Sequence, residues 1–239
     1  MEYYLTSSTI VYETRKLNPA NGFISALRAS LEGRNSALFV CSDPESHEHT
    51  DRFAREIWQS LEEEGMTFSH RAVLDGRNEG DAPALVKEAD FLVLAGGHVP
   101  TQNAFFHRIG LRELLRGWDG VVMGISAGSM NAADMVYAQP ELPGEARDPS
   151  FRRFLPGLGL TKVMLLPHMQ ALRHEVLDGL RSYEDIAFPD SMGREIFAIP
   201  DGSYLYGQDG QEEFRGETWR VADGAMERIC GDGEVITVK

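Results

Sequence analysis

The segment 120–130, with the sequence GVVMGISAGSM, constrains the fold of this chain more than any other. Its first part, 121–125, is a short apolar run of the kind that forms a buried strand. The part that follows, 127–135, holds small and helix-forming residues. We therefore predict a buried strand that turns sharply into a helix.

Gly124, Ser126 and Gly128 form a G-x-S-x-G pattern at this turn. In a nucleophile elbow, a serine on a strained strand-to-helix turn projects its hydroxyl out of the sheet, and a side chain at either glycine would crowd the turn. The alternative is a tight turn with an ordinary serine. We predict that Ser126 is a nucleophile and that the backbone N–H of Ala127, at the helix start, donates to a developing oxyanion.

Strands and helices alternate along the chain, and the strands are nearly continuous apolar runs. Such alternation predicts an α/β fold: a mostly parallel sheet with helices on both faces. We predict strands at 3–6, 36–41, 68–74, 91–95, 121–125, 161–166 and 195–199, and helices at 21–31, 51–64, 82–88, 102–118, 127–135 and 175–183.

The rest of the chain predicts loops and hairpins. Residues 137–159 are rich in Pro, Gly and charge and predict a long loop, which in a compact domain is usually functional or mobile. Short β-like runs at 203–206, 217–222 and 235–238 are separated by Gly-Asp and Asp-Gly turns, which predict C-terminal antiparallel hairpins. With no repeat or linker in the sequence, we expect one domain spanning 1–239.

Composition excludes several classes of function. The net charge is −14 and no basic stripe stands out, which argues against a nucleic-acid partner. No apolar run approaches the roughly 20 residues that a membrane span needs. The two cysteines, Cys41 and Cys230, lack neighbouring metal ligands and predict free thiols in a reducing compartment. We expect a cytoplasmic monomer or homodimer that needs no metal or organic cofactor.

Several predicted strands end in residues suited to catalysis: Gly97 and His98, Ser126, His168 and Asp201. Ligands of open α/β sheets bind beyond the carboxyl ends of the strands, so these side chains are expected at one edge of the sheet. His168 is the candidate base that takes the serine proton. His98 is expected to line the site. The polar run 43–51, with two histidines, predicts a solvated loop before a helix more readily than a metal site.

The acid that would orient His168 has two candidates. Asp201 ends an apolar strand and precedes a glycine, although aspartate is also common in turns. Glu141 lies in the long loop 137–159, where an exposed carboxylate is the alternative interpretation. The sequence leaves the choice between them open.

Four stretches together resemble the dipeptidase E family of serine peptidases, which is related to cyanophycinase. They are Ala95-Gly96-Gly97, Gly124 to Ser129, Leu166-Pro167-His168 and Ile199 to Gly202. The resemblance implies the class I glutamine amidotransferase-like fold, a flavodoxin-like three-layer sandwich. It further implies that Ser126 is the nucleophile and His168 the base, and that Gly97 supplies an oxyanion-hole N–H.

The chain departs from the family pattern in three places. The family usually has Gly-Gly-Asn-Thr where this chain has Gly96-Gly97-His98, so His98 is expected to change what the pocket accepts. Asp201 stands where the family has a glutamate assigned as the triad acid. Glu141 stands where the family has an aspartate that has also been proposed for that role. Family members remove an N-terminal aspartate from dipeptides, which requires a cation such as Arg173 or Arg181.

The function we expect is that of a serine exopeptidase or dipeptidase acting on short peptides, with N-terminal aspartate as the substrate feature that the resemblance implies. The alternatives are an esterase or amidase with the same site, and a catalytically silent member that binds a peptide or small molecule. An α/β hydrolase is disfavoured because only 42 residues (168 − 126) separate Ser126 from His168. An amidotransferase is disfavoured because that fold's amidotransferases use a cysteine nucleophile.

Overall fold

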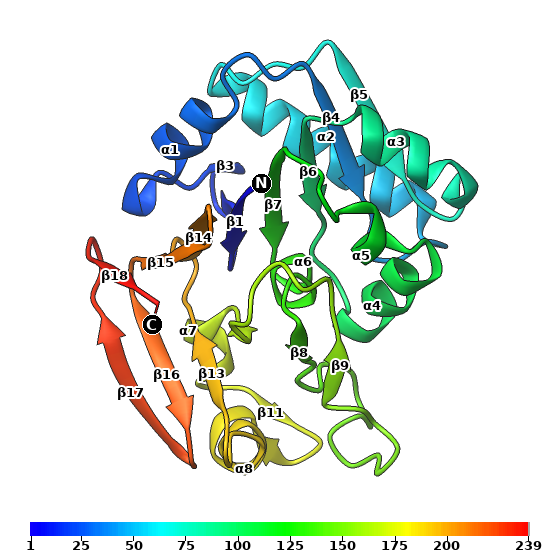
Figure 1. The fold of residues 1–239 in the computed structure, drawn as a ribbon. Helices are drawn as coiled ribbons and strands as arrows, with labels where there is room; N and C mark the ends of the chain where they lie inside the picture. Colours follow the sequence, from blue (N-terminus) through cyan, green and yellow to red (C-terminus); the bar gives the residue numbers. More distant parts are fainter. Residues whose placement is uncertain (239) are drawn as a thin grey trace.

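The computed structural model describes residues 1–238, which are arranged around an eight-stranded sheet in the order β18-β15-β14-β1-β7-β6-β4-β5 (Figure 1). The five strands from β1 to β5 in this order run parallel, and β14, β15 and β18 add an antiparallel edge. The strands are β1 (Glu2–Thr6), β4 (Ser36–Val40), β5 (His70–Leu74), β6 (Phe91–Leu94), β7 (Val121–Ile125), β14 (Tyr204–Gln208), β15 (Gln211–Arg215) and β18 (Val235–Thr237).

Helices cover both faces of this sheet because its central strands are apolar on both sides. Phe39 and Val93 pack on the face under α1 (Phe23–Ser30) and α2 (His47–Glu63). Their neighbours Leu38 and Leu92 point to the opposite face, where the covering helices are α3 (Ala82–Glu88), α4 (Val99–Arg108) and α5 (Leu111–Leu114). The α/β fold with a mostly parallel sheet between helical layers, as predicted, is confirmed.

A second sheet of four strands lies beside the first. Its order is β10 (Leu165–Leu166), β13 (Glu195–Ala198), β16 (Thr218–Ala222) and β17 (Ala225–Cys230). Strands β10 and β13 are parallel, and the remaining pairs are antiparallel. The chain passes from β13 to β14 and β15 in the large sheet, returns to β16 and β17, and ends in β18 of the large sheet. With the earlier passage from β7 in the large sheet to β10 in the small one, the chain crosses between the two sheets four times.

Three predicted helices differ in the structure. The segment 175–183 is a hairpin, β11 (Val176–Leu177) and β12 (Leu180–Arg181), so the predicted helix there is wrong. Asp178 and Gly179 both adopt positive φ, which suits the two-residue turn of a hairpin. The hairpin leads into a π-helical turn, η3 (Ser182–Ala187), and then α8 (Phe188–Asp190).

The elbow helix, α6 (Ala127–Asn131), is shorter than predicted. The carbonyl groups of Asn131 and Ala132 accept hydrogen bonds from the N–H groups of Leu158 and Leu160, so they are not free to continue the helix. The predicted helix 102–118 is divided into α4 and α5 at Gly110, which has a positive φ of 65°.

Other element bounds shift by a few residues, and α2 begins at His47 rather than at 51. The predicted loop 137–159 begins and ends in a hairpin of β8 (Met135–Tyr137) and β9 (Phe154–Pro156). The remaining short elements are β2 (Ile10–Val11), β3 (Lys16–Leu17), η1 (Ala20–Gly22), η2 (Glu79–Asp81) and α7 (Met169–Leu172). Among residues 1–238, no helix combines the length and apolar character needed to cross a membrane.

Candidate active site

Ser126 occupies the turn between β7 and α6 in a strained conformation, with φ 50° and ψ −111°. A serine seldom adopts positive φ, and the surrounding structure must hold it there. Its N–H donates to the carbonyl groups of Thr6 and Ser7, both at 3.1 Å. A β-carbon added at Gly128 would lie 2.2 Å from the carbonyl oxygen of Leu94, so only glycine fits beside the turn.

His168 follows β10 and caps α7 in the left-handed conformation, with φ 57° and ψ 34°. Its Nε2 lies 2.9 Å from Ser126 Oγ. About a third of the side chain, 31%, is exposed. The ring therefore faces both the serine and the solvent side from which a substrate would arrive.

Asp201 reaches the other side of the same imidazole ring. Its Oδ1 lies 2.9 Å from His168 Nδ1, and its Oδ2 accepts a hydrogen bond of 2.7 Å from Gln170 Nε2. The two residues meet because β10 and β13 are parallel neighbours, with Leu166 paired to Ala198, so both chain segments leave the sheet at the same edge.

The hydrogen bonds around His168 determine which of its two ring nitrogens carries the proton. Burial alone would raise the pKa of Asp201, but hydrogen bonds from His168, Ser7 and Gln170 outweigh it and hold that pKa below its usual range. The ionised carboxylate only accepts hydrogen bonds, so the proton of His168 lies on Nδ1. Nε2 then presents its lone pair to the hydroxyl of Ser126, which is the tautomer a general base requires.

Two backbone N–H groups beside Ser126 are available for an oxyanion. Within residues 1–238, the N–H groups of Gly97 and Ala127 have no hydrogen-bond partner in the protein. The loop carrying Gly97 lies against the serine, since a β-carbon added at Gly96 would be 3.4 Å from Ser126 Cβ. Unpaired N–H groups next to a nucleophile can stabilise a negatively charged oxygen.

A buried amide network fixes both ends of this loop. Gln102 Nε2 donates to the carbonyl of Ala95 at 2.7 Å, and Asn131 Nδ2 donates to the carbonyl of Val99 at 3.2 Å. The two amides also bond to each other at 3.0 Å, and neither side chain is exposed. Because Asn131 is the last residue of α6, these hydrogen bonds connect the loop that carries Gly97 to the helix that follows Ser126.

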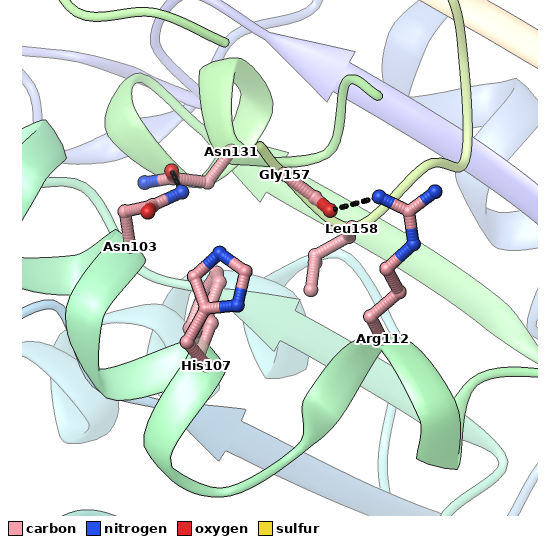
Figure 2. Close-up of a pocket in the computed structure, with 7 residues that line it drawn as sticks. Asn103, His107, Arg112, Asn131, Gly157 and Leu158 are labelled. Atoms are coloured by element: carbon pink, nitrogen blue, oxygen red, sulfur yellow. Dashed lines mark hydrogen bonds between the residues drawn. The ribbon is translucent and has the colours of Figure 1, made fainter. Parts of the chain in front are cut away.

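Behind α6 lies a small cavity in which Asn103 and Asn131 point toward each other (Figure 2). Asn103 Nδ2 donates to Asn131 Oδ1 at 2.9 Å, and Arg112 donates to the carbonyl of Gly157 at 2.9 Å. The cavity volume is about 10 Å³, roughly the space of one water molecule. The cavity is too small to hold a peptide. The hydrogen bond from Asn103 beside it holds Asn131, the last residue of α6, in place.

His98, expected to line the site, is tied to the segment between β8 and β9. Its Nε2 lies 2.9 Å from Glu145 Oε1 and its Nδ1 lies 2.8 Å from Thr101 Oγ1. Glu145 also accepts the N–H groups of Glu141 and Leu142, both at 2.9 Å. The loop that carries Gly97 and His98 and the segment between β8 and β9 are thus held together through the carboxylate of Glu145.

Glu141, the alternative acid, does not join the hydrogen bonds around His168. It lies on the surface, and among residues 1–238 its carboxylate has no hydrogen-bond partner. Although the residue is exposed as a whole, the protein around its carboxyl group reduces the hydration of that group, and this, with the neighbouring carboxylates of Glu145 and Glu175, raises its pKa to about 7. A carboxyl group that is half protonated near neutral pH is poorly suited to stabilise an imidazolium ion.

His47 and His49 lie in the first turn of α2 rather than in a loop. In the part of the chain that the structure describes, no three His, Cys, Asp or Glu side chains are grouped so as to hold a metal ion.

Sequence reasoning missed Ser7, a fully buried residue directly after β1. Its hydroxyl donates to Asp201 Oδ1 and accepts the N–H of His168 at 2.8 Å. A signal was available, because β1 is also a parallel strand and its carboxyl end lies at the same edge as that of β7.

Ser126 lies on the turn after a central parallel strand and is hydrogen-bonded to His168, an arrangement that serine hydrolases of several folds share. The sequence matches the model of peptidase family S51 over residues 4–214. The chain belongs to this family and is a serine-type peptidase, as the resemblance in the sequence predicted.

Solved structures share the fold. The crystal structure of a peptidase from an acI-B1 Actinobacterium is similar with a TM-score of 0.70 and 17% identity, covering 99% of this chain and 96% of that one. A candidate peptidase E protein from Listeria monocytogenes EGD-e is similar with a TM-score of 0.58 and 15% identity, covering 95% and 98%. No curated protein sequence matches the chain.

Proposed function

We propose that the protein is an exopeptidase that cleaves dipeptides and other short peptides, with Ser126 as nucleophile, His168 as base and Asp201 as the orienting acid. The observation that carries the proposal is the chain of hydrogen bonds from Ser126 Oγ to His168 Nε2 and from His168 Nδ1 to Asp201 Oδ1, both 2.9 Å. Membership of a serine peptidase family supports the reaction class. The resemblance of the sequence motifs around Gly97, Ser126 and His168 to the dipeptidase E family supports the substrate class.

The reaction begins when Ser126 Oγ attacks the carbonyl carbon of the scissile bond and its proton passes to His168 Nε2. Asp201 stabilises the resulting imidazolium ion. The oxyanion of the tetrahedral intermediate accepts hydrogen bonds from the N–H groups of Gly97 and Ala127. The imidazolium then donates its proton to the leaving amine, and the C–N bond breaks to give an acyl-enzyme.

The second half of the reaction reverses these roles with water as nucleophile. His168 removes a proton from water as the water oxygen attacks the acyl carbon, and the same proton is returned to Ser126 Oγ when the ester bond breaks. The products are a carboxylic acid and the amine released earlier, and one water molecule is consumed for each peptide bond cleaved.

Arg173 and Arg181, the two candidates for binding a substrate carboxylate, differ in whether a carboxylate of the protein already pairs with them. Arg181 is paired with Asp185, with Nε and Nη2 at 2.9 and 2.8 Å from the carboxylate. Arg173 lies over the ring of Trp219 at 4.4 Å, and within residues 1–238 no carboxylate pairs with it. We therefore favour Arg173 over Arg181 as the cation for an acidic substrate, if the protein prefers one.

The test is hydrolysis of a dipeptide panel that includes several Asp-X members, by wild type and by Ser126→Ala. Turnover of Asp-X that vanishes in the variant supports both the mechanism and acidic specificity. Turnover of other dipeptides alone, again lost in the variant, supports the mechanism and directs attention to His98 for specificity. Near-normal turnover by Ser126→Ala contradicts the proposal.

A further inference from the structure

Ser7 contacts all three residues of the proposed catalytic set, although it lies about 120 residues or more from each of them in the sequence. Its carbonyl oxygen accepts the N–H of Ser126 at 3.1 Å. Its hydroxyl accepts the N–H of His168 at 2.8 Å and donates to Asp201 Oδ1. In the described part of the chain, no other side chain bonds to both His168 and Asp201.

These bonds leave the hydroxyl no freedom. The backbone N–H of His168 can only donate, so it occupies a lone pair of Ser7 Oγ. The single hydroxyl proton must then go to Asp201, which accepts only. Ser7 is fully buried, so water cannot replace either partner when the hydroxyl is removed.

We propose that Ser7 is a positioning residue that aligns His168 and Asp201 and tunes the basicity of the imidazole through Asp201. This inference rests on the proposed function, because it assigns Ser7 a role in that same site. The hydroxyl holds the left-handed backbone of His168 in place and shares the Asp201 oxygen that bonds to Nδ1. The Ser7 hydroxyl and the Nδ1–H group of His168 donate to the same oxygen of Asp201. The bond from Ser7 therefore weakens the hydrogen bond between that oxygen and the imidazolium ion.

Removal of the hydroxyl has two separable effects. In Ser7→Ala, His168 loses one backbone anchor, so fewer molecules hold Nε2 in line with Ser126 Oγ, and kcat falls on the order of 10- to 100-fold. Asp201 becomes a stronger acceptor for Nδ1–H, which stabilises the imidazolium ion. The acid limb of the kcat/KM profile therefore moves to higher pH. The variant KM stays within about twofold, because the hydroxyl is buried away from the substrate.

Ser8→Ala is a matched control. Ser8 is the next residue, is also buried, and its hydroxyl donates to the carbonyl of Ile10 at 2.9 Å, with no bond to the proposed catalytic residues. A general effect of removing a buried hydroxyl in this segment would appear in both variants as a lower melting temperature. An effect on His168 would appear in Ser7→Ala alone.

The experiment measures the rate constant for labelling of Ser126 by a fluorophosphonate across pH, alongside dipeptide turnover, in wild type, Ser7→Ala and Ser8→Ala. Labelling reports on folded molecules only and needs no knowledge of the substrate. Slower labelling with a raised acid limb in Ser7→Ala, and wild-type behaviour in Ser8→Ala, is the expected result. Rates and acid limbs that match in all three proteins, or fall equally in both variants, overturn the role of Ser7.

The two proposals fail in different ways. If wild type is labelled but cleaves no peptide, the substrate assignment fails and the labelling comparison still tests Ser7. If wild type cleaves dipeptides and Ser7→Ala matches it, only the role of Ser7 fails. Should Ser7→Ala not fold, Ser7→Cys keeps a weaker donor at the same position and is expected to label at an intermediate rate. A wild-type rate for Ser7→Cys contradicts the role.

Discussion

Asp201 and Glu141 differ in the one property that a carboxylate partner of histidine needs, which is a negative charge held against the ring. Asp201 lies 2.9 Å from His168 Nδ1 and its pKa is lowered. Glu141 has no bond to the ring and its pKa is raised to about 7. At the level of single residues, Asp201 is therefore the carboxylate suited to orient His168, and Glu141 is not.

We expect Asp201→Asn to lower kcat on the order of 10⁴-fold, because the amide would favour the wrong tautomer of His168. Glu141→Gln should change kcat by less than about threefold, since the side chain has no bond to His168. Steady-state kinetics on the best dipeptide measures both. The reverse order of effects would move the acid from Asp201 to Glu141.

The same two carboxyl groups should give opposite pH dependences of stability. The folded pKa of Asp201 lies below its unfolded value of about 3.9, so its stabilisation is present above that pH and is lost as pH falls from about 5 through the folded pKa. The folded pKa of Glu141 is raised, so stability falls as pH rises from about 4.3 to about 7. Exposure of Glu141 to solvent reduces its effect.

Thermal or urea unfolding of wild type, Asp201→Asn and Glu141→Gln between pH 3 and 8 measures these slopes. The difference in the free energy of unfolding between wild type and Asp201→Asn should become smaller toward acid pH. The difference in the free energy of unfolding between wild type and Glu141→Gln should change toward neutral pH. Parallel curves for all three proteins would show that neither carboxyl is shifted by folding.

Residues next to a local sequence signal were predicted, whereas Ser7, whose only signal is its place directly after a strand, was missed. Ser126 is flanked by two glycines that the turn demands, and His168 and Asp201 follow apolar strands. The choice between the two acids depends on β10 and β13 being parallel neighbours, a pairing across some 30 residues that no local pattern encodes. Ser7 is an ordinary serine until the fold brings His168 beside it.

At the scale of elements, the elbow works because α6 packs directly on β6. A β-carbon at Gly128 would approach Leu94 O to 2.2 Å, and backbone cannot yield as a flexible side chain can. We expect Gly128→Ala to destabilise the protein by about 1–3 kcal/mol and to displace Ser126, so that labelling is lost. The measurement is urea unfolding together with fluorophosphonate labelling.

Gly80→Ala provides the matched control for that variant. No atom lies within 4 Å of a β-carbon added at Gly80, and its φ is not in the left-handed region. Its stability should change by no more than about 0.5 kcal/mol, with normal labelling. If Gly128→Ala behaved the same way, close packing of α6 would not explain the glycine.

Long, strongly apolar elements were predictable, whereas short hairpins were not. The buried strands of the large sheet were found because both their faces are apolar. The hairpin β11–β12 has two residues in each strand, so its hydrophobic pattern cannot be told from a helical one, and only Asp178-Gly179 indicates the turn. Strands β15 (QEEFR) and β17 (AMERIC) were missed because neither alternates apolar and polar residues, so neither shows the pattern typical of a half-buried strand.

At the scale of the whole molecule, the proposed catalytic set spans the two sheets. Ser126 follows β7 in the large sheet, while His168 and Asp201 follow β10 and β13 in the small one. The distance between nucleophile and base therefore depends on how the sheets are held together. Four crossings of the chain and the packing of Phe197 of β13 on Phe214 of β15, with ring centroids 5.1 Å apart, provide that connection.

Removal of the last strands tests this dependence. A chain ending at Arg215 lacks β16 and β17, so β13 loses its antiparallel partner and the buried side chain of Val221. We expect loss of cooperative unfolding and of labelling, measured by circular dichroism and fluorophosphonate reactivity. A chain ending at Glu234 lacks only β18, whose three residues are exposed, and should retain both properties. Retention of labelling by the shorter chain would show that the small sheet needs no support from β16.

The position of β1 also determines when activity can first arise during synthesis. This strand is made before the other strands of the large sheet, yet it lies between β7 and β14, and Tyr4 pairs with Tyr206. At roughly 5–20 residues per second, the ribosome adds Tyr206 on the order of ten seconds or more after Tyr4. For almost all of that interval the set of Ser126, His168 and Asp201 proposed for catalysis is incomplete, so we expect a nascent chain to cleave no peptides before β13 and β14 are made.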